Sequence, residues 1–310
     1  MTTGGRLAAI LASGRFAVTG EVVPPRSADG AAVTDHARAL VGYVDAANVT
    51  DNPIASAHMS PLAGVRFVSA AGVEPTVQLT CRDRNRLGIT ADLLGAWALG
   101  ARNLLCLTGD PLAIGDHPDA TVVNDLSVLD MVGLAKQMRD VGTTLSGAEI
   151  ADPPRYLIAV ADMPLADPYD PKRLEDKLDA GADLVMTQIA YDVEALNAWA
   201  DLMRARGLFD RANVVVGVVP LRSAKAARFM HERLPGVRVP GFMIEDLERA
   251  GDDAAEVGIG HTIDVVQGIR GIADVAGVHL MGMGRDDAVA RVVEGAGLFP
   301  RPTGVSSATD

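Results

Sequence analysis

Several residue types that define common classes of protein are scarce in this sequence. Among its 310 residues there are 2 cysteines, and aromatic residues make up 4%. The cysteines, Cys81 and Cys106, lie in apolar runs without CxxC spacing, which excludes a disulfide framework and argues against a structural zinc site. We therefore expect two reduced, buried thiols in a cytoplasmic protein.

The histidines are few and scattered, with no HxH, HExxH or i,i+4 pair among the 6. We therefore expect no catalytic metal. No serine lies in a nucleophile elbow, and neither cysteine has the surroundings of a catalytic thiol. The polar residues that remain are carboxylates, amides and small side chains, which suit the binding of an organic cofactor that carries the chemistry itself.

Clustered positive charge and long apolar runs are also missing. The net charge is −12, and the densest basic stretch, Arg82–Arg86, is broken by Asp83. A nucleic-acid partner requires clustered Lys and Arg, so we expect none. The apolar stretch Leu7–Leu11 ends before Ser13 and Gly14. It is too short for a signal or a membrane span, and we expect no membrane partner.

What the sequence does contain is a large apolar fraction, 48%, in short runs that alternate with segments of helical period. Because the runs lack period-two alternation, they fit parallel strands buried on both faces. The predicted strands are Phe16–Val23, Val44–Val49, Thr76–Leu79, Leu104–Leu107, Tyr156–Val160, Leu184–Thr187, Val214–Val219 and Val278–Met283. The predicted helices include Thr90–Leu99, Leu126–Met138, Lys172–Ala180, Val193–Arg206, Ala224–Arg233 and Ala254–Val275.

This alternation of strands and helices is typical of a closed barrel. An open, doubly wound sheet is the alternative, but no GxGxxG follows the first strand and no linker divides the chain. We predict an α/β fold, a single-domain (β/α)8 TIM barrel over residues 16–300. An N-terminal helix at 1–15 precedes it, and a flexible tail at 301–310 follows.

In such a barrel, ligand-binding groups lie at the C-terminal ends of the strands. Glu21 interrupts an apolar strand, where an ionised carboxylate is costly unless it is paired. It is either a general acid in a partly dry pocket or a structural carboxylate paired with Arg26 or another barrel arginine. The residues alone favour neither reading.

Two further strand ends carry candidate groups. Asp110 follows Gly109, which allows a close approach of backbone and ligand, so its carboxylate can face a ligand. Alternatively it caps the next helical segment, which would start at Pro111. Gln188 ends a buried strand and suits a heteroaromatic ring with donors and acceptors, although a water or backbone partner is the simpler reading.

Six motifs in order resemble 5,10-methylenetetrahydrofolate reductases over roughly Phe16 to Leu298. The first is the strand signature Glu-Val-Val-Pro-Pro-Arg, and the loop Thr-Gly-Asp-Pro resembles reductase domains fused to homocysteine methyltransferases. The motifs are Gly20–Arg26, Asn48–Thr50, Gln78–Asn85, Leu107–Pro111, Lys177–Asp183 with Thr187–Gln188 and Tyr191–Asp192, and Gly217–Leu221.

The resemblance implies FAD-dependent reduction of 5,10-methylenetetrahydrofolate to 5-methyltetrahydrofolate in one-carbon metabolism and methionine biosynthesis. It implies that Glu21 is the general acid, that Asp110 lies near both flavin and pterin, and that Gln188 and Arg285 bind the folate. The implied cofactor-binding residues are Thr50, Gln78, Leu107, Thr108, Gly109, Asp110, Asp170, Arg173 and Lys177. Arg173 and Lys177 would meet the FAD phosphates, or else belong to an ordinary solvated helix face.

The chain departs from the better-known FAD-bound type at several positions. Thr108 replaces an arginine, Gln78 a histidine and Ala224 an aromatic residue, and Ala159–Asp162 lacks a further aromatic. NADH or NADPH is the expected electron donor, and a redox partner protein is an alternative. Direct hydride transfer without bound flavin, or a non-catalytic folate- or flavin-binding homologue, also remain open. We expect a homo-oligomer, as in relatives.

Overall fold

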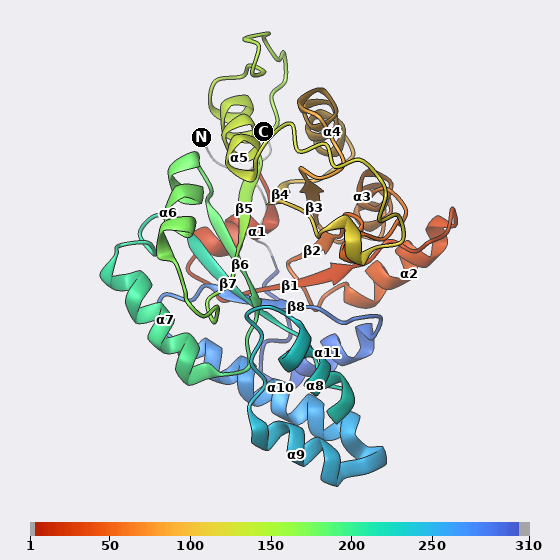
Figure 1. The fold of residues 1–310 in the computed structure, drawn as a ribbon, viewed down its shortest axis with the longest axis vertical. Coiled ribbons are helices and arrows are strands. Elements are labelled where there is room, and N and C mark those ends of the chain that lie inside the picture. Colours follow the sequence, from red (N-terminus) through yellow and green to blue (C-terminus); the bar gives the residue numbers. More distant parts are fainter. Residues whose placement is uncertain (1–3, 304–310) are drawn as a thin grey trace.

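The computed structural model describes residues 4–303 and consists of eight parallel strands in a closed barrel, with helices around it (Figure 1). The strands follow one another around the barrel in chain order, and β8 pairs with β1. The predicted (β/α)8 barrel is therefore confirmed. The strands are β1 (Ala17–Val22), β2 (Ala46–Val49), β3 (Pro75–Thr80), β4 (Asn103–Leu107), β5 (Leu157–Asp162), β6 (Leu184–Ile189), β7 (Asn213–Val218) and β8 (Gly277–Leu280).

The helices that the periodicity predicted are all present, with ends shifted by a few residues. They are α4 (Arg86–Ala98), α5 (Val128–Asp140), α6 (Pro171–Ala180), α7 (Val193–Ala205), α8 (Ala224–Arg233) and α10 (Ala254–Arg270). The last of these was predicted to run to Val275 and stops at Arg270. Further helices are α1 (Arg6–Ala12), α2 (Gly30–Leu40), α3 (Pro61–Ala70), α9 (Gly241–Ala250) and α11 (Asp286–Gly295).

Side-chain caps fix where many of these helices begin. Ser127 and Asp130 form a reciprocal capping box at the start of α5, and Asn85 accepts a hydrogen bond from the Gly88 N–H in α4. Asp170 and Asp192 cap α6 and α7 in the same way. Each cap satisfies a backbone donor that the helix leaves free, and so sets the end of the preceding βα loop.

Helix α1 closes the N-terminal end of the barrel. Its buried residues Leu7, Ile10 and Leu11 form one apolar cluster with inward-facing strand residues such as Leu105 and Met186. This floor is apolar and packed, so access to the barrel axis is from the opposite, C-terminal end. The predicted N-terminal helix therefore has a clear structural role.

The first and last described segments of the chain meet beneath this floor. Residues 301–303 of the predicted tail are described, and Arg301 is buried against Asp45; residues 304–310 lie outside the described part of the chain. Between residues 4 and 303, no helix combines the length and the apolar character that crossing a membrane requires.

Candidate active site

The C-terminal mouth of the barrel collects most of the predicted site residues. Gln78 is paired in register with Leu105, a member of the barrel-floor cluster, so its strand position faces the barrel axis. Glu21, Thr50, Leu107 and Gln188 come from the corresponding ends of β1, β2, β4 and β6. Alternation along parallel strands thus brings these residues, far apart in sequence, to one rim.

Glu21 contacts a histidine across the seam that closes the barrel. Its Oε2 lies 3.9 Å from Nε2 of His279, and its side chain is 12% exposed. The other ring nitrogen of His279, Nδ1, is 2.9 Å from the Thr19 hydroxyl. Arg26, the partner that the sequence suggested as an alternative, pairs instead with Asp116 at 2.8 Å. Glu21 therefore has a histidine neighbour and is largely enclosed.

Buried polar atoms without partners lie at the rim and below it on the neighbouring strands β2 and β3. Asn48 is next to Glu21 in the strand register, and Thr76 is next to Asn48. Within residues 4–303, Asn48 Oδ1, Thr50 Oγ1 and Thr76 Oγ1 are buried and have no hydrogen-bond partner. Buried polar groups are normally paired, so these oxygens can receive donors from water or from a ligand.

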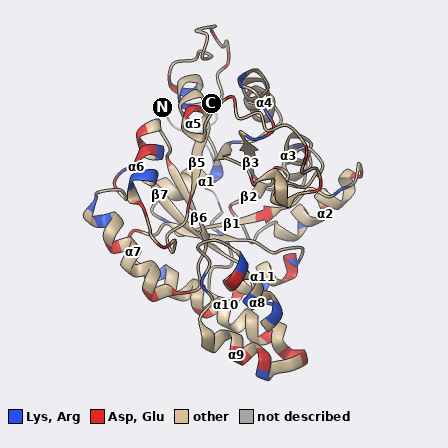
Figure 2. Ribbon diagram, in the orientation of Figure 1, with Lys and Arg blue, Asp and Glu red and all other residues tan. Residues whose placement is uncertain are grey.

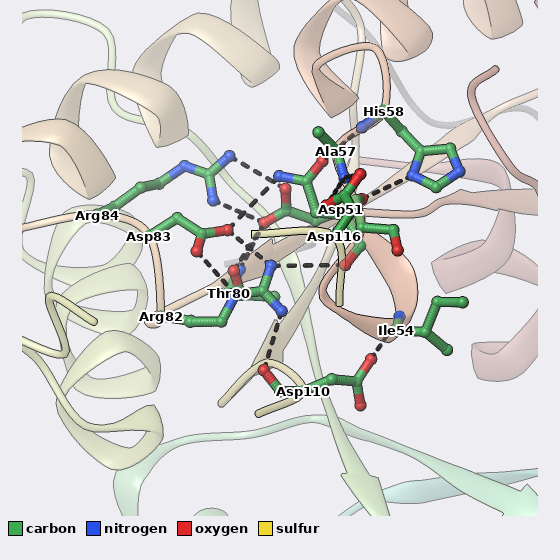
Figure 3. A network of polar contacts seen from close by, with 12 residues as sticks. Asp51, Ile54, Ala57, His58, Thr80, Arg82, Asp83, Arg84, Asp110 and Asp116 are labelled. Atoms are coloured by element: carbon green, nitrogen blue, oxygen red, sulfur yellow. Dashed lines mark hydrogen bonds and ion pairs between the residues drawn. The ribbon is translucent and has the colours of Figure 1, made fainter. Parts of the chain in front are cut away.

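Asp110 lies on the loop after β4 and is exposed, with a defined contact. Its Oδ2 accepts a hydrogen bond from the backbone N–H of Ile54 at 2.7 Å (Figure 3). The alternative that Asp110 caps the next helical segment is not what the structure shows. The 3-10 turn Leu112–Ile114 follows Pro111, and no side chain caps it. The carboxylate therefore joins the loops after β4 and β2.

Gln188 and Arg285 both have partners within the protein. Gln188 Oε1 accepts from the backbone N–H of Ile189 at 3.0 Å, so the backbone partner considered from sequence is present. Gln188 lies where the register of the β6–β7 pairing shifts, between Met186 and Ile189. Arg285 precedes α11 and pairs with Asp287 at 3.3 Å, with 30% of its side chain exposed.

A pocket of about 370 Å³ opens beside the end of β4. It is bounded by Thr108 on one side and by the segment leading into α5 on the other. The lining residues are Cys81, Thr108, Asn124, Leu126, Ser127, Val128 and Leu129. Its walls are largely apolar side chains, so it suits a flat ring or an aliphatic group more than a charged one.

The three residues expected on α6 differ in their surroundings. Asp170 caps the helix, and Arg173 is exposed with only a distant contact, 3.8 Å, to Asp170. Lys177 turns inward, and its Nζ donates to the carbonyl of Ala161 at 2.5 Å. Burial lowers the pKa of Lys177, although the nearby Asp162 carboxylate opposes that effect. Lys177 is thus not part of a solvated helix face.

Asp162 is a buried carboxylate at the end of β5 that the sequence did not single out as functional. It accepts a hydrogen bond from the hydroxyl of Tyr169 at 2.9 Å. Desolvation raises the pKa of Asp162, against the opposing effects of Tyr169 and Lys177. The cluster lies at the end of β5, beside Lys177 of α6.

Charge over the rest of the molecule is mixed. Figure 2 shows basic and acidic residues side by side along α6, α9 and α11. Many charged residues of the molecule form ion pairs with a neighbouring element. Examples are Arg206 with Glu175 at 2.5 Å and Arg204 with Asp274 at 2.8 Å. Exposed pairs of this kind contribute little to stability, so they say little about the site.

Two further residues belong to the site although their role was not foreseen. His279 was treated as one of several scattered histidines, because its contact with Glu21 depends on pairing between the first and last strands. Arg82 lies in the Gln78–Asn85 motif, which gives it no partner, and its guanidinium contacts the carbonyl of Asp110 at 3.1 Å. Neither contact has a local sequence signal.

These features define a (β/α)8 barrel with a carboxylate, histidine and amide rim at its open end. The family model for methylenetetrahydrofolate reductase matches residues 6–297 of the chain. The protein therefore belongs to the methylenetetrahydrofolate reductase family.

Individual relatives agree over much of this length. Methylenetetrahydrofolate reductase 2 of Schizosaccharomyces pombe is 27% identical over 233 residues, covering 73% of this chain and 36% of its own length. The 5,10-methylenetetrahydrofolate reductase of Salmonella typhimurium is 26% identical over 199 residues, covering 63% of this chain and 61% of its own length. The matched part of this chain thus spans only 36% of the length of the Schizosaccharomyces pombe protein.

Solved structures show the same fold at low sequence identity. A protein from Clostridium thermocellum, described as binding two copies of 5-methyl-5,6,7,8-tetrahydrofolic acid, superposes with a TM-score of 0.62 at 12% identity. The match covers 93% of this chain and 95% of that one. A tryptophan synthase from Mycobacterium tuberculosis superposes with a TM-score of 0.52 at 15% identity, covering 94% and 98%. Both matches concern the fold.

Proposed function

We propose that this protein reduces 5,10-methylenetetrahydrofolate to 5-methyltetrahydrofolate, with Glu21 as general acid. The observation that carries the proposal is the position of Glu21, at the mouth of the barrel with 12% exposure and a histidine neighbour at 3.9 Å. Membership of the reductase family and the folate ligands of the Clostridium barrel support the choice of substrate.

Glu21 would act on the bridge that joins N5 and N10 of the substrate. Its carboxyl group gives a proton to N10, the bond from N10 to the bridging carbon breaks, and an N5 iminium ion remains. Hydride adds to the iminium carbon and forms the methyl group. Because a cationic acceptor takes hydride more readily than a neutral one, proton donation by a positioned acid matters for the rate.

Asp110 and Gln188 would hold the pterin while this happens. The Asp110 carboxylate is exposed at the mouth and negatively charged, so it favours an iminium ion over the neutral substrate. The Gln188 amide retains its N–H groups as donors, because only its Oε1 is used by the Ile189 N–H. Arg285, at the rim, is the proposed partner for the anionic part of the folate.

FAD is the proposed cofactor, and the rim has groups that fit a polar ring system. Thr50 Oγ1 is buried and lacks a partner among residues 4–303, and Gln78 lies on the neighbouring strand. Together with Leu107, Thr108, Gly109 and Asp110 they would hold the ring, and Asp170, Arg173 and Lys177 would hold the remainder. Reduced flavin, when bound, supplies hydride.

A second electron route is favoured by the contacts of Lys177. Its ammonium group already donates to the Ala161 carbonyl and lies near Asp162, so it is partly neutralised within the protein. A diphosphate would have to compete with these partners. In this route, NADH or NADPH binds as a co-substrate and gives hydride directly to the folate, with Glu21 in the same role.

Substitution of Glu21 tests the acid in either route. We expect Glu21→Gln to lower the rate of 5-methyltetrahydrofolate formation by about 100-fold or more. Binding of the folate should change by only a few-fold, because the amide is isosteric. Glu149 is an exposed glutamate in the segment between α5 and β5. The Glu149→Gln variant is therefore the control and should behave as wild type. A Glu21→Gln protein with the wild-type rate would refute the role.

Absorbance distinguishes the two electron routes. Under the FAD route, the purified protein or its mixture with added FAD has a flavin band that bleaches with NADH or NADPH and recovers on addition of methylenetetrahydrofolate. Under the direct route, product forms at an unchanged rate in flavin-free protein. Failure to bind FAD together with absence of flavin-free turnover would contradict both.

A further inference from the structure

We propose that Arg82 is a positioning residue that holds Asp110 in place for the reaction. The inference rests on the proposed function, because it assumes that the Asp110 carboxylate faces the substrate. It concerns a side chain to which neither family membership nor the sequence motifs give a role. The contacts around Arg82 are drawn in Figure 3.

The Arg82 guanidinium joins three segments of the chain. Its Nη1 donates to the carbonyl oxygen of Asp110 at 3.1 Å, and its Nη2 donates to the carbonyl of Asn52 at 3.4 Å. Its Nε and Nη2 both donate to the Asp83 carboxylate at 2.7 Å. A planar guanidinium can make such divergent contacts at once, whereas a lysine cannot.

The side chain of Asp110 is also held, by the segment after β2 that contains Asn52. Its Oδ2 accepts from the Ile54 N–H at 2.7 Å, so main chain and carboxylate are both held against the segment after β2. That segment is itself conformationally constrained, since Asn52 and Ile54 have φ values of 47° and 51°. A β-branched residue in the left-handed region is unusual, and surrounding contacts must maintain it.

Gly109 adapts the loop to the arginine. It has a φ of 92°, and a Cβ at this position would lie 2.9 Å from Cβ of Arg82. The backbone of the Asp110 loop therefore passes directly over the arginine stem. A side chain at residue 109 would push the loop away from the guanidinium and from the Asn52 carbonyl.

The surroundings of Arg82 fit positioning and do not fit anion binding. Its side chain is 4% exposed, and its charge is matched by Asp83. The hydrogen bond to Asp83 is the main factor that raises the pKa of Arg82. A guanidinium whose donors are used by two carbonyls and a carboxylate has little capacity for a phosphate ligand.

The chain offers a matched control two residues away. Arg84 is 15% exposed and pairs with Asp51 at 2.6 Å and with Asp92 at 2.7 Å. These partners are carboxylates, so Arg84 is a largely enclosed arginine paired with carboxylates, as Arg82 is with Asp83. Its hydrogen bonds go to Asp51 and Asp92, and not to Gly109 or Asp110. Arg84→Gln therefore measures the general cost of removing such a residue.

A double-mutant cycle tests whether Arg82 acts through Asp110. We expect Arg82→Gln to lower kcat by about 10- to 100-fold, with a loss of similar order in Asp110→Asn. The double variant should be no slower than Asp110→Asn within about twofold, because the positioned group is already gone. In Arg84→Gln with Asp110→Asn the two losses should instead multiply.

Amide exchange supplies a readout independent of turnover. Release of Asp110 exposes the Ile54 N–H, so we expect its hydrogen exchange to be at least tenfold faster in Arg82→Gln and unchanged in Arg84→Gln. If Arg82→Gln does not fold, judged by circular dichroism, the same cycle and exchange measurement are made with Arg82→Lys, for which smaller losses in the same pattern are expected.

The possible results separate this inference from the proposed function. Wild-type activity in Asp110→Asn would remove the role of Asp110 and so overturn the proposed function at this residue. A slow Asp110→Asn combined with an active Arg82→Gln would overturn only the positioning role. Losses that multiply in the Arg82–Asp110 double variant, or unchanged Ile54 exchange, would do the same.

Discussion

Glu21 and Asp110 are both acidic residues at strand ends, but their surroundings differ. Glu21 is largely enclosed, with 12% of its side chain exposed, and lies beside a histidine, whereas Asp110 is exposed and accepts a hydrogen bond from a backbone N–H. A group that must deliver a proton benefits from a site with little water, while a group that stabilises a cation can be solvated. The two environments thus match the two proposed roles.

The sequence could predict these residues as candidates but not their partners. An acidic residue in an apolar strand, or after a Gly at a strand end, is visible in the sequence itself. The contact of Glu21 with His279 requires closure of the barrel, and that of Asp110 with Ile54 requires two loops to meet. Arg26 is close to Glu21 in the sequence, but in the structure it pairs with Asp116, a residue far from it in the sequence.

The thiol of Cys81 offers a test of burial at the rim. Burial raises its pKa to about 11, so below that pH the thiol form predominates. Burial raises the pKa of Cys106 as well. We expect native protein at pH 8 to react slowly with a thiol reagent, to react faster as the pH approaches 11, and to react at once when unfolded. Fast labelling of native protein at pH 8 would contradict this burial.

The unpaired hydroxyl of Thr76 predicts a gain in stability on its removal. Thr76 is fully buried, and its Oγ1 has no partner in residues 4–303. We expect Thr76→Val, which keeps the shape, to raise the free energy of unfolding by about 1 kcal/mol. Urea denaturation measures this difference.

Thr80, on the same strand, is the control for this prediction. Its hydroxyl donates to Asp51 at 3.0 Å. Thr80→Val leaves that buried acceptor with one donor fewer, so we expect a loss of about 1–2 kcal/mol. Equal losses in the two variants would mean that Thr76 has a hydrogen-bond partner, such as a bound water.

At the scale of whole elements, the strands were the most predictable part. Each is a short, mainly apolar run, because helices cover its outer face and the barrel core its inner face. Helices α2, α3, α9 and α11 were not singled out. Helix α2 buries only Val33, Ala37 and Leu40, and α9 only Met243 and Leu247. Helices α6 and α8, which the sequence did predict, also bury only two residues each, so the number of buried residues does not explain the difference.

Helix α1 is the element whose contribution is easiest to measure. Leu7 is fully buried in the barrel floor. We expect Leu7→Ala to lower the free energy of unfolding by about 3 kcal/mol, the usual cost of a cavity in a packed core. Leu87→Ala, with 76% of the leucine exposed on α4, should change it by less than about 0.5 kcal/mol. Similar values for both would mean that α1 does not seal the floor.

For the whole molecule, a buried charge cluster joins the first and last described segments of the chain. Asp45 contacts Arg301 at 2.5 Å and Arg6 at 3.1 Å, and accepts a hydrogen bond from the Val18 N–H. Arg301 also donates to the carbonyl of Phe16 at 2.7 Å. The first turn of α1, the start of β1 and the segment after α11 are thereby held together below the barrel.

Removal of Arg301 should therefore destabilise the entire barrel. It leaves Asp45 buried with one cation instead of two, and we expect Arg301→Gln to cost about 3 kcal/mol of unfolding free energy. Arg291→Gln, which breaks an exposed pair with Glu256, is the control and should leave the unfolding midpoint unchanged. Equal midpoints for the two variants would show that the contact between Arg301 and Asp45 contributes no stability.

The central claim is that Glu21 enables hydride transfer to an activated folate at this mouth. The most direct measurement is a single turnover of purified protein with deuterated NADH or NADPH and methylenetetrahydrofolate, with added FAD, analysed by mass spectrometry. The account predicts 5-methyltetrahydrofolate from wild type and at least about 100-fold less from Glu21→Gln. Absence of product from wild type, or equal product from both proteins, would contradict it.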